Sequence, residues 1–300
     1  MTKSSAGRAA KEQKAISLIN QGKLKEAEKI YGDLIATGTR NHIIYGNLAA
    51  VCGMQGNFNK TTDLLEKAIE LKPDFPEHHY NLGIAVQKKG DLNAAIISYN
   101  KAIELKPEYT DAHYNLGNAL KEKGDLIAAI ASYHLALRLK PNFLEAHVNC
   151  GSALKDKYEL TAAIASYEEA LRLKPDHAEA HNGMGCALKE KSELTKAITS
   201  FKKAIKLKPN YPDAFNNLGN AFKDKGDLNA AIASYKTALQ LKPNFPDAHY
   251  NLGFSLQRQD YLTAAITSYK KLGLSRRAFL YEAIAAVVLP CSWNATPRLL

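Results

Sequence analysis

The tripeptide Leu-Lys-Pro recurs at a fixed interval, and this recurrence constrains the fold more than any other feature of the chain. Its prolines follow one another every 34 residues, at Pro73, Pro107, Pro141, Pro175, Pro209 and Pro243. Repetition at this interval is typical of stacked helical hairpins, in which each unit buries its apolar face only against its neighbours. The sequence therefore predicts an array of helix pairs rather than a single globular core.

The segment 110–143 shows how one repeat is built. His113 and Leu116 lie three residues apart and start an apolar stripe on one face of a first helix. Gly124 permits the left-handed conformation that ends a helix, and Asp125 can cap the helix that follows. A second apolar stripe then runs to the next Leu-Lys-Pro, where proline stops the helix. Each repeat is therefore predicted to be a helix–turn–helix hairpin.

This pattern resembles the tetratricopeptide repeat (TPR) family. Six units hold one register, and they span 42–75, 76–109, 110–143, 144–177, 178–211 and 212–245. A seventh unit begins at residue 246, and a weaker one at 8–41 keeps Gly22, Ala27 and Tyr31. The unit 110–143 is similar to repeats of O-GlcNAc transferases through the stretch YNLGNALKEKGDL. The resemblance implies an all-α fold, a right-handed superhelical solenoid of TPR hairpins.

Three regions follow from the repeat register. Residues 1–41 form an N-terminal segment with a degenerate TPR, and 42–272 form the array of six well-matched repeats and a partial seventh. Residues 273–300 are a C-terminal tail outside the repeat, because Leu272 stands where earlier units have a small residue. The tail is either a cap helix over 276–289, which could also make a homodimer contact, or the altered or truncated end of a longer array.

An asparagine recurs where no packing role explains it. At about 100° per residue, Asn115 lies opposite the stripe of His113 and Leu116. In TPR superhelices this face lines the concave groove, and an asparagine ladder holds the protein substrates of O-GlcNAc transferases. A primary amide carries two donors and an acceptor, so a row of them can bind the backbone of an extended peptide. The predicted peptide-binding residues are Asn47, Asn81, Asn115, Asn118, Asn149, Asn217, Asn220 and Asn251, with an interruption at Gly183.

A simpler alternative assigns these asparagines no ligand. They would then make hydrogen bonds within their own repeats, or they would be solvated surface. Two cysteines lie on these first helices. Cys150 replaces a buried leucine, so we expect it in the core, whereas Cys186 is expected to face the groove.

Charge narrows the class of partner. The formal net charge is +10, yet the groove face carries acids, among them Glu122, Asp156, Glu190 and Asp224. Chaperone-binding TPR domains hold a C-terminal carboxylate with Lys and Arg, and the matching places here carry Asp, Glu or Asn. That ligand is therefore not expected. A nucleic-acid partner is disfavoured, because the aromatic residues lie on packing stripes rather than among basic patches.

No catalytic or metal-binding pattern occurs. The chain lacks GxxxxGK[ST], HExxH, GxSxG and CxxC. His177 and His181 are four residues apart, but His181 recurs in most repeats, which favours packing over metal binding. We therefore predict no catalytic residue, no cofactor and no metal, and a protein that is not an enzyme.

The expected location is the cytoplasm, with no membrane association. The four cysteines have no ligand spacing, the N-terminus has no apolar signal-peptide core, and the longest apolar stretch is too short to span a bilayer. The predicted function is a protein–protein interaction scaffold that binds an extended peptide segment in the groove. The alternative is the substrate-recruiting arm of a larger O-GlcNAc-transferase-like enzyme whose catalytic domain is absent from this sequence. A nucleic-acid binder is the third hypothesis.

Overall fold

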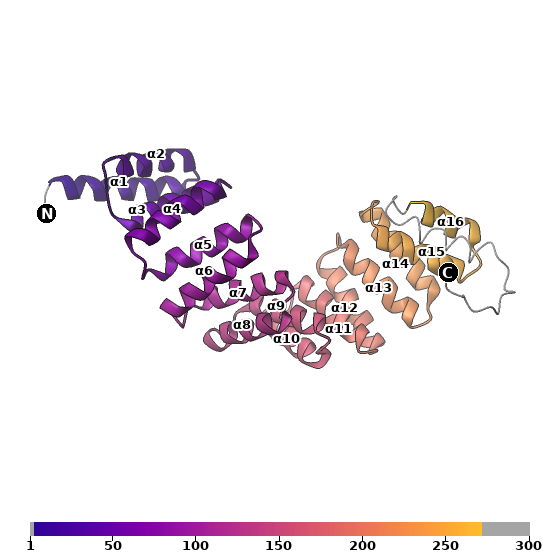
Figure 1. Cartoon of the computed structure of the whole chain (residues 1–300). Coiled ribbons are helices and arrows are strands. Elements are labelled where there is room, and N and C mark those ends of the chain that lie inside the picture. The colour runs from indigo at the N-terminus through magenta and orange to yellow at the C-terminus, as the bar shows by residue number, and fades with distance from the viewer. Residues whose placement is uncertain (1–2, 272–300) are drawn as a thin grey trace, which may run out of the picture. The chain divides into compact units, whose positions relative to one another are not determined.

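The computed structural model describes residues 3–271, and throughout that range the chain forms helices joined by short turns. Within each of the compact units described below, successive helices pair as hairpins, and neighbouring hairpins are in contact (Figure 1). The predicted all-α hairpin solenoid is confirmed. The helices are α1 (Lys3–Asn20), α2 (Leu24–Ala36), α3 (His42–Met54), α4 (Phe58–Leu71), α5 (Pro76–Lys88), α6 (Leu92–Leu105), α7 (Thr110–Lys123), α8 (Leu126–Leu139), α9 (Leu144–Asp156), α10 (Leu160–Leu173), α11 (Ala178–Glu190), α12 (Leu194–Leu207), α13 (Pro212–Asp224), α14 (Leu228–Leu241), α15 (Pro246–Gln257) and α16 (Leu262–Lys270).

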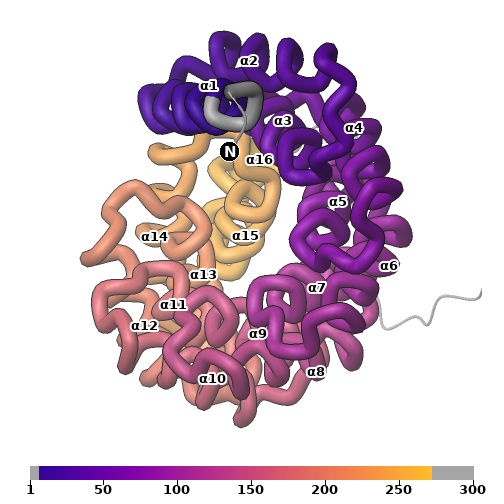
Figure 2. The backbone as a smooth tube through the Cα atoms, turned by 90° about the vertical axis from the view of Figure 1, so that its left-hand side faces the viewer, coloured from indigo at the N-terminus to yellow at the C-terminus, as the bar shows by residue number. Residues whose placement is uncertain are grey.

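The chain divides into two compact units, Met1–Ala153 and Leu154–Leu300. Unit 1 holds α1 to α8 and most of α9, and unit 2 holds α10 to α16. Within unit 1, α3, α5 and α7 lie on one side and α4, α6 and α8 on the other (Figure 2). We call the side formed by α3, α5 and α7 the odd-helix face of unit 1. Unit 2 has the same internal arrangement, with α11, α13 and α15 in contact in that order.

In several hairpins the turn between the two helices follows the predicted chemistry. Gly124 ends α7 with a φ of 91°, and the Asp125 carboxylate accepts a hydrogen bond of 3.1 Å from the Ala128 N–H at the start of α8. Asp91 and Asp227 cap α6 and α14 in the same way. These local signals fix where one helix stops and the next begins.

A tyrosine of the second helix packs on a glycine of the first in four of the described hairpins. Tyr99, Tyr133 and Tyr235 are fully buried. A Cβ atom on Gly117 would lie 2.6 Å from the Tyr133 ring, which is closer than packed atoms can approach. The glycine is therefore required for the ring to fit, and the predicted packing role of the recurring glycine is confirmed.

The ends of the array bear on three further predictions. The first hairpin, α1 and α2, keeps Ala27 and Tyr31 fully buried, as the degenerate repeat implied, although α1 begins five residues before the expected start at residue 8. The tail at 273–300, with its cap-helix and dimer hypotheses, lies outside the described residues. Between residues 3 and 271, no helix has the length and apolar character needed to cross a membrane.

Candidate peptide-binding surface

The predicted asparagines all lie on the first helices of their hairpins, and all are half-buried. In unit 1 they are carried by α3, α5, α7 and α9, and in unit 2 by α13 and α15. Their positions agree with the face that helical spacing predicted. Their hydrogen bonds show how much of each amide remains available to a ligand.

In unit 1 the amides join one hairpin to the next. The Asn115 Nδ2 donates to the Tyr80 hydroxyl at 2.9 Å, which ties α7 to α5. The Asn149 Nδ2 donates to the Tyr114 hydroxyl and to the Asn118 Oδ1, each at 2.9 Å, which ties α9 to α7. Both donors of Asn149 are thus occupied, and what it can offer a peptide is its carbonyl oxygen.

The same bond recurs in unit 2 with amides as acceptors. The Asn217 Nδ2 donates to the Asn182 Oδ1 at 3.1 Å and to the Cys186 Sγ at 3.4 Å. The Asn251 Nδ2 donates to the Asn216 Oδ1 at 3.1 Å. These bonds run between repeats, so the alternative of bonds within repeats describes only part of the network. The sequence carries a signal for them, because an acceptor precedes each donor by 35 residues.

Asn118 and Asn220 make the bonds within repeats. The Tyr133 hydroxyl donates to the Asn118 Oδ1 and the Tyr235 hydroxyl to the Asn220 Oδ1, both at 2.8 Å. The amide thereby satisfies the one polar atom of a buried ring. Peptide binding by the asparagine row stays a prediction, and the structure adds that most of these amides also hold the array together.

The interruption at Gly183 has a steric cause. A Cβ atom on Gly183 would lie 2.6 Å from the ring of Tyr167, which packs from α10. An asparagine cannot enter that space while the ring occupies it. The aromatic ring therefore takes the place of one amide in the row.

The two cysteines behave differently. Cys150 is fully buried, as expected. Cys186 is half-buried, and burial raises the pKa of its thiol to about 11. The thiol is therefore protonated at neutral pH and is a weak nucleophile, even though it lies on the same helix face as the amides.

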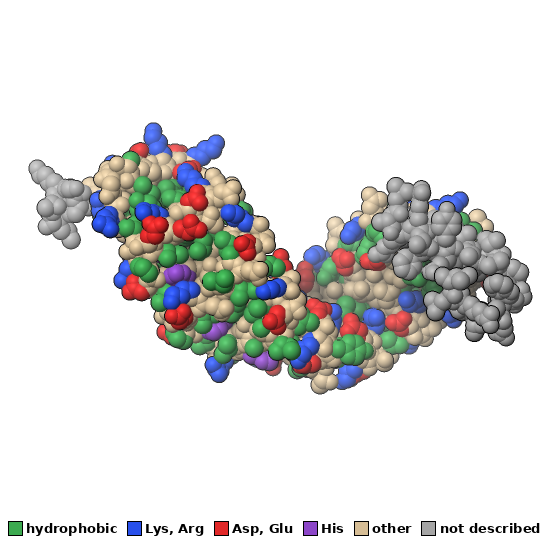
Figure 3. Space-filling view, in the orientation of Figure 1, with side chains coloured by type: hydrophobic (Ala, Val, Ile, Leu, Met, Phe, Trp, Pro, Cys, Tyr) green, Lys and Arg blue, Asp and Glu red, His purple; other side chains and the backbone are tan. Residues whose placement is uncertain are grey.

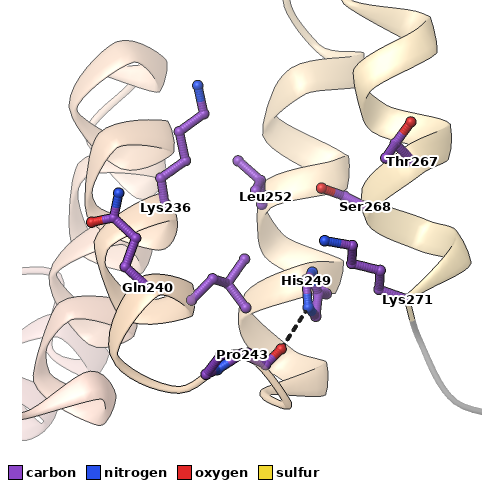
Figure 4. A pocket seen from close by; sticks show the side chains of 9 residues that line it. Lys236, Gln240, Pro243, His249, Leu252, Thr267, Ser268 and Lys271 are labelled. Carbon is purple, nitrogen blue, oxygen red and sulfur yellow. Dashed lines mark hydrogen bonds between the residues drawn. The ribbon is translucent and has the colours of Figure 1, made fainter.

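The recurring histidine holds the loop that joins two hairpins. In α15 the His249 Nε2 bonds the carbonyl oxygen of Pro243 at 2.9 Å, beside a pocket of about 300 Å³ (Figure 4). Because a carbonyl only accepts, this nitrogen must carry the proton. The same bond joins His79 to Pro73 at 2.8 Å and His181 to Pro175 at 3.0 Å. The sequence pattern predicted packing for these rings but not their hydrogen bond to the proline carbonyl.

The two histidines considered as a metal-binding pair, His177 and His181, both make hydrogen bonds to the backbone. The His181 ring bonds its loop, and the His177 Nδ1 accepts a hydrogen bond of 3.1 Å from the Ala180 N–H, which caps α11. Among the described residues, no three His, Cys, Asp or Glu side chains come together as a metal site would require.

Asn81 departs from the pattern of its row. The residues that would correspond to its acceptors are Gly46 and Ala50, and neither has a side-chain acceptor. Within residues 3–271, no hydrogen bond joins the Asn81 amide to another side chain. Asn81 instead lines a pocket of about 310 Å³ between α3 and α5, whose floor includes Leu65 of α4. We call this the apolar pocket, because Asn81 and Lys88 are its main polar groups.

A second pocket adjoins the first along α5. It has a volume of about 400 Å³, lies between α5 and α7, and is lined by the amides of Asn115 and Asn118. We call it the amide pocket. Ile84 and Lys88 of α5 line both pockets, so the pockets lie next to each other on the odd-helix face of unit 1, and we call the two together the depression.

Charges of both signs are interspersed over the surface of each unit that faces the viewer in Figure 3. The lysines that precede the prolines serve the loops: the Lys140 Nζ lies 4.6 Å from the Phe143 ring centre, and the Lys208 Nζ lies 4.7 Å from that of Tyr211. Lys208 also pairs with Glu179 at 2.8 Å. Much of the cationic excess is therefore engaged in the turns between repeats.

Comparison with known families agrees with this architecture. A TPR repeat family matches residues 51–90, 88–124, 151–192, 185–226 and 219–260, and a tetratricopeptide repeat family matches residues 110–143. These matches cover more than half of the chain. The chain belongs to the tetratricopeptide repeat family, whose members serve as protein–protein interaction scaffolds.

Individual relatives share only part of the chain. A 65-residue segment is 31% identical to a Hsp70-Hsp90 organising protein of Plasmodium falciparum, which is 22% of this chain and 26% of the relative. The chain thus spans about a quarter of that protein, and it spans 12% of a second one of the same name from isolate 3D7.

Solved structures show the same fold at low identity. A tetratricopeptide repeat protein from Parabacteroides merdae aligns over 84% of this chain and all of its own, at 16% identity and a TM-score of 0.68. YrrB, described as a TPR protein with an unusual peptide-binding site, aligns over 61% of this chain and 95% of its own, at 24% identity and a TM-score of 0.53.

Proposed function

We propose that the odd-helix face of unit 1 binds an extended segment of a partner protein along α5. The observation that carries this proposal is that the apolar pocket and the amide pocket lie side by side along α5, where Ile84 and Lys88 line both. Apolar side chains of the segment enter the first pocket, and its backbone meets the amides of Asn115 and Asn118 in the second. A depression that combines apolar lining with a few convergent polar groups is the usual form of a binding site.

Capture of partners from a whole-cell extract tests this function. The full chain is compared with the double variant Asn115→Ala, Asn118→Ala and with a matched control, Asn93→Ala, Asn100→Ala, which removes two exposed amides of α6. Captured proteins are identified by mass spectrometry, and circular dichroism establishes that each variant is folded. We expect the double variant to lose proteins that the control retains.

The proposal is wrong if the folded double variant captures the same proteins as the control. Loss of the Tyr80 and Tyr133 partners is expected to cost about 1 kcal/mol each. The comparison is therefore made well below the melting temperature of the weakest variant.

The nature of the partner is narrowed by charge. The similarity to a Hsp70-Hsp90 organising protein suggests chaperones as partners. A C-terminal carboxylate, however, would meet Asp111 and Glu122 on α7, where the clamp for such a ligand needs cations. An internal peptide segment is favoured, and neither nucleic acid nor a membrane is proposed as a partner.

The role as a substrate-recruiting arm of an O-GlcNAc-transferase-like enzyme stays a second proposal. It is supported by the similarity of the unit 110–143 and by the amides of Asn115, Asn118 and Asn149 that lie together in unit 1. In that case the same surface would hold substrates for a catalytic region outside this sequence. The expectations of a non-enzymatic chain and a cytoplasmic location belong to the same set of proposals.

A further inference from the structure

The apolar pocket has an apolar lining because the repeat at 42–75 departs from its successors. Its first helix carries small residues on the face toward α5, and the buried ring of its second helix is replaced by an aliphatic side chain. Gly46, Ala50, Gly53 and Leu65 stand where the next repeat has Tyr80, Ile84, Gln87 and Tyr99. In the next repeat the equivalent space is the amide pocket, where Gln87 and Tyr99 make the lining polar. The Tyr99 hydroxyl donates to the Gln87 Oε1 at 2.9 Å.

A neighbouring cluster keeps the wall of this region small. The ring of His78 is 3% exposed, and its Cε1 lies 2.7 Å from where a Cβ of Gly46 would be. His78 is fixed in turn by a 2.8 Å hydrogen bond to His42 and by the Phe75 ring, whose centre is 4.5 Å away. Any larger residue at Gly46 would displace this cluster. The absence of an acceptor for Asn81 is thus built into the packing of α3 against α5.

The rim of the apolar pocket offers a hydrogen-bonding amide and a cation. Asn81 keeps both donors and its acceptor for a ligand, unlike Asn149. Lys88 is exposed, and within the described part of the chain no ion pair involves it. In the next four repeats the place of Lys88 is taken by acids, beginning with Glu122. The charge at this end of the depression is therefore positive.

We infer that the apolar pocket anchors one large apolar side chain of an extended partner segment, and that an acidic residue of the segment lies beside it against Lys88. Asn81 bonds the backbone of the segment at the anchor. The volume of about 310 Å³ accommodates a side chain such as leucine, methionine or phenylalanine. This inference rests on the proposed function and adds the chemistry of the bound segment.

Charge complementarity selects an acidic segment over a neutral or basic one. The acid is expected on the side of Lys88 that faces the apolar pocket, because Glu122 lines the amide pocket and would repel it there. The Glu122 carboxylate accepts a hydrogen bond of 3.2 Å from Gln87, which holds it in that pocket. The segment should therefore carry uncharged residues where it crosses α7.

Selection from a peptide library tests the inference. A phage-displayed library of random dodecapeptides is selected on the immobilised full chain, and enriched peptides are synthesised with a fluorescein label. We expect enrichment of Leu, Met or Phe within two positions of Asp or Glu. Replacing the apolar residue of an enriched peptide by alanine should weaken its Kd, measured by fluorescence anisotropy, at least about tenfold.

Variants of the chain locate the bound peptide. Ala50→Leu fills the apolar pocket from an exposed position, and Ala131→Leu, at an exposed position of α8, is its matched control. We expect Ala50→Leu to weaken binding about tenfold and Ala131→Leu to leave it unchanged. Lys88→Glu should weaken acidic peptides, and a peptide with lysine in place of its acid should regain affinity for that variant.

The outcomes separate this inference from the function on which it rests. If no peptide is enriched, peptide recognition itself is overturned. If peptides are enriched and bind Ala50→Leu and Lys88→Glu as well as the unchanged chain, yet lose affinity for Asn115→Ala, Asn118→Ala, the function stands and the anchor pocket is wrong. The alanine replacement in the peptide needs no variant of the chain. The anchor is therefore tested even if Ala50→Leu does not fold.

Discussion

At the scale of the residue, the turns inside the hairpins test how much the backbone conformation of one residue contributes to the free energy of unfolding. Gly56, Gly90, Gly124 and Gly226 adopt positive φ at these turns, whereas Tyr158, Ser192 and Asp260 do so with side chains. A side chain in the left-handed region costs about 1–2 kcal/mol, and glycine recovers part of that at an entropic cost in the unfolded chain.

Ser192→Gly should therefore stabilise unit 2, by about 0.5–1 kcal/mol. Ser192 has a φ of 64° and is exposed, so the change removes strain and little else. The free energy of unfolding is measured by urea denaturation. Gly124→Ser is the reciprocal control and should lose a similar amount. A loss of stability in Ser192→Gly would contradict the account of strain.

At the scale of the element, α3 and α5 meet through two histidines. The His42 Nδ1 lies 2.8 Å from the His78 Nε2, so one nitrogen donates and the other accepts. Burial, with repulsion from the His42 ring, lowers the pKa of His78 to about 4. Burial also lowers the pKa of His42. Protonation of both rings would remove the acceptor and place two cations side by side.

This contact predicts a loss of stability in mild acid. The unfolded chain binds a proton on His78 with the ordinary pKa of about 6.5, whereas the folded chain does so only near 4. The stabilisation is therefore complete above about pH 6.5 and falls as the pH drops toward 4. Between pH 7 and pH 5 the expected loss is about 1–2 kcal/mol.

Urea unfolding at several pH values measures this effect as a difference between variants. His78→Ala should flatten the dependence on pH relative to the unchanged chain. His134→Ala removes an exposed histidine of α8 and should keep the original dependence. If both variants show the same dependence, the titration belongs to other histidines and the explanation is wrong.

At the scale of the whole molecule, stability in a repeat array is a sum of hairpins and the contacts between neighbours. Residues 7–11 of α1 are all exposed, so few contacts hold this part of the helix. In α5, by contrast, Gly83 and Ala85 are buried.

Hydrogen exchange should therefore be uneven along the chain. Backbone amides of residues 7–11 are expected to exchange at least about 100-fold faster than those of Gly83 and Ala85, because opening them exposes little apolar surface. Mass spectrometry or NMR measures these rates at fixed pH and temperature. Equal protection in the two segments would show that α1 is held by contacts that its exposure does not reveal.

The sequence by itself determined the hairpins. A proline every 34 residues, Gly124 and Asp125 at the turn, and the apolar stripes are local signals whose physical meaning needs only neighbours along the helix. The helix pairs, the buried tyrosines and the face of the asparagines could therefore be predicted. Residues 273–300 remain a prediction of the sequence alone.

Tertiary structure alone decided which hydrogen bonds the asparagines make and where the pockets lie. The bond from Asn115 to Tyr80 joins residues 35 apart, and it forms only when two hairpins are stacked. Asn81 has no side-chain acceptor on α3 because the His78 ring occupies the space beside Gly46. No local pattern indicates this contact between α3 and α5. Spacing along a helix fixes which residues share a face, whereas the packing of one helix on another fixes which of them keep a free hydrogen bond.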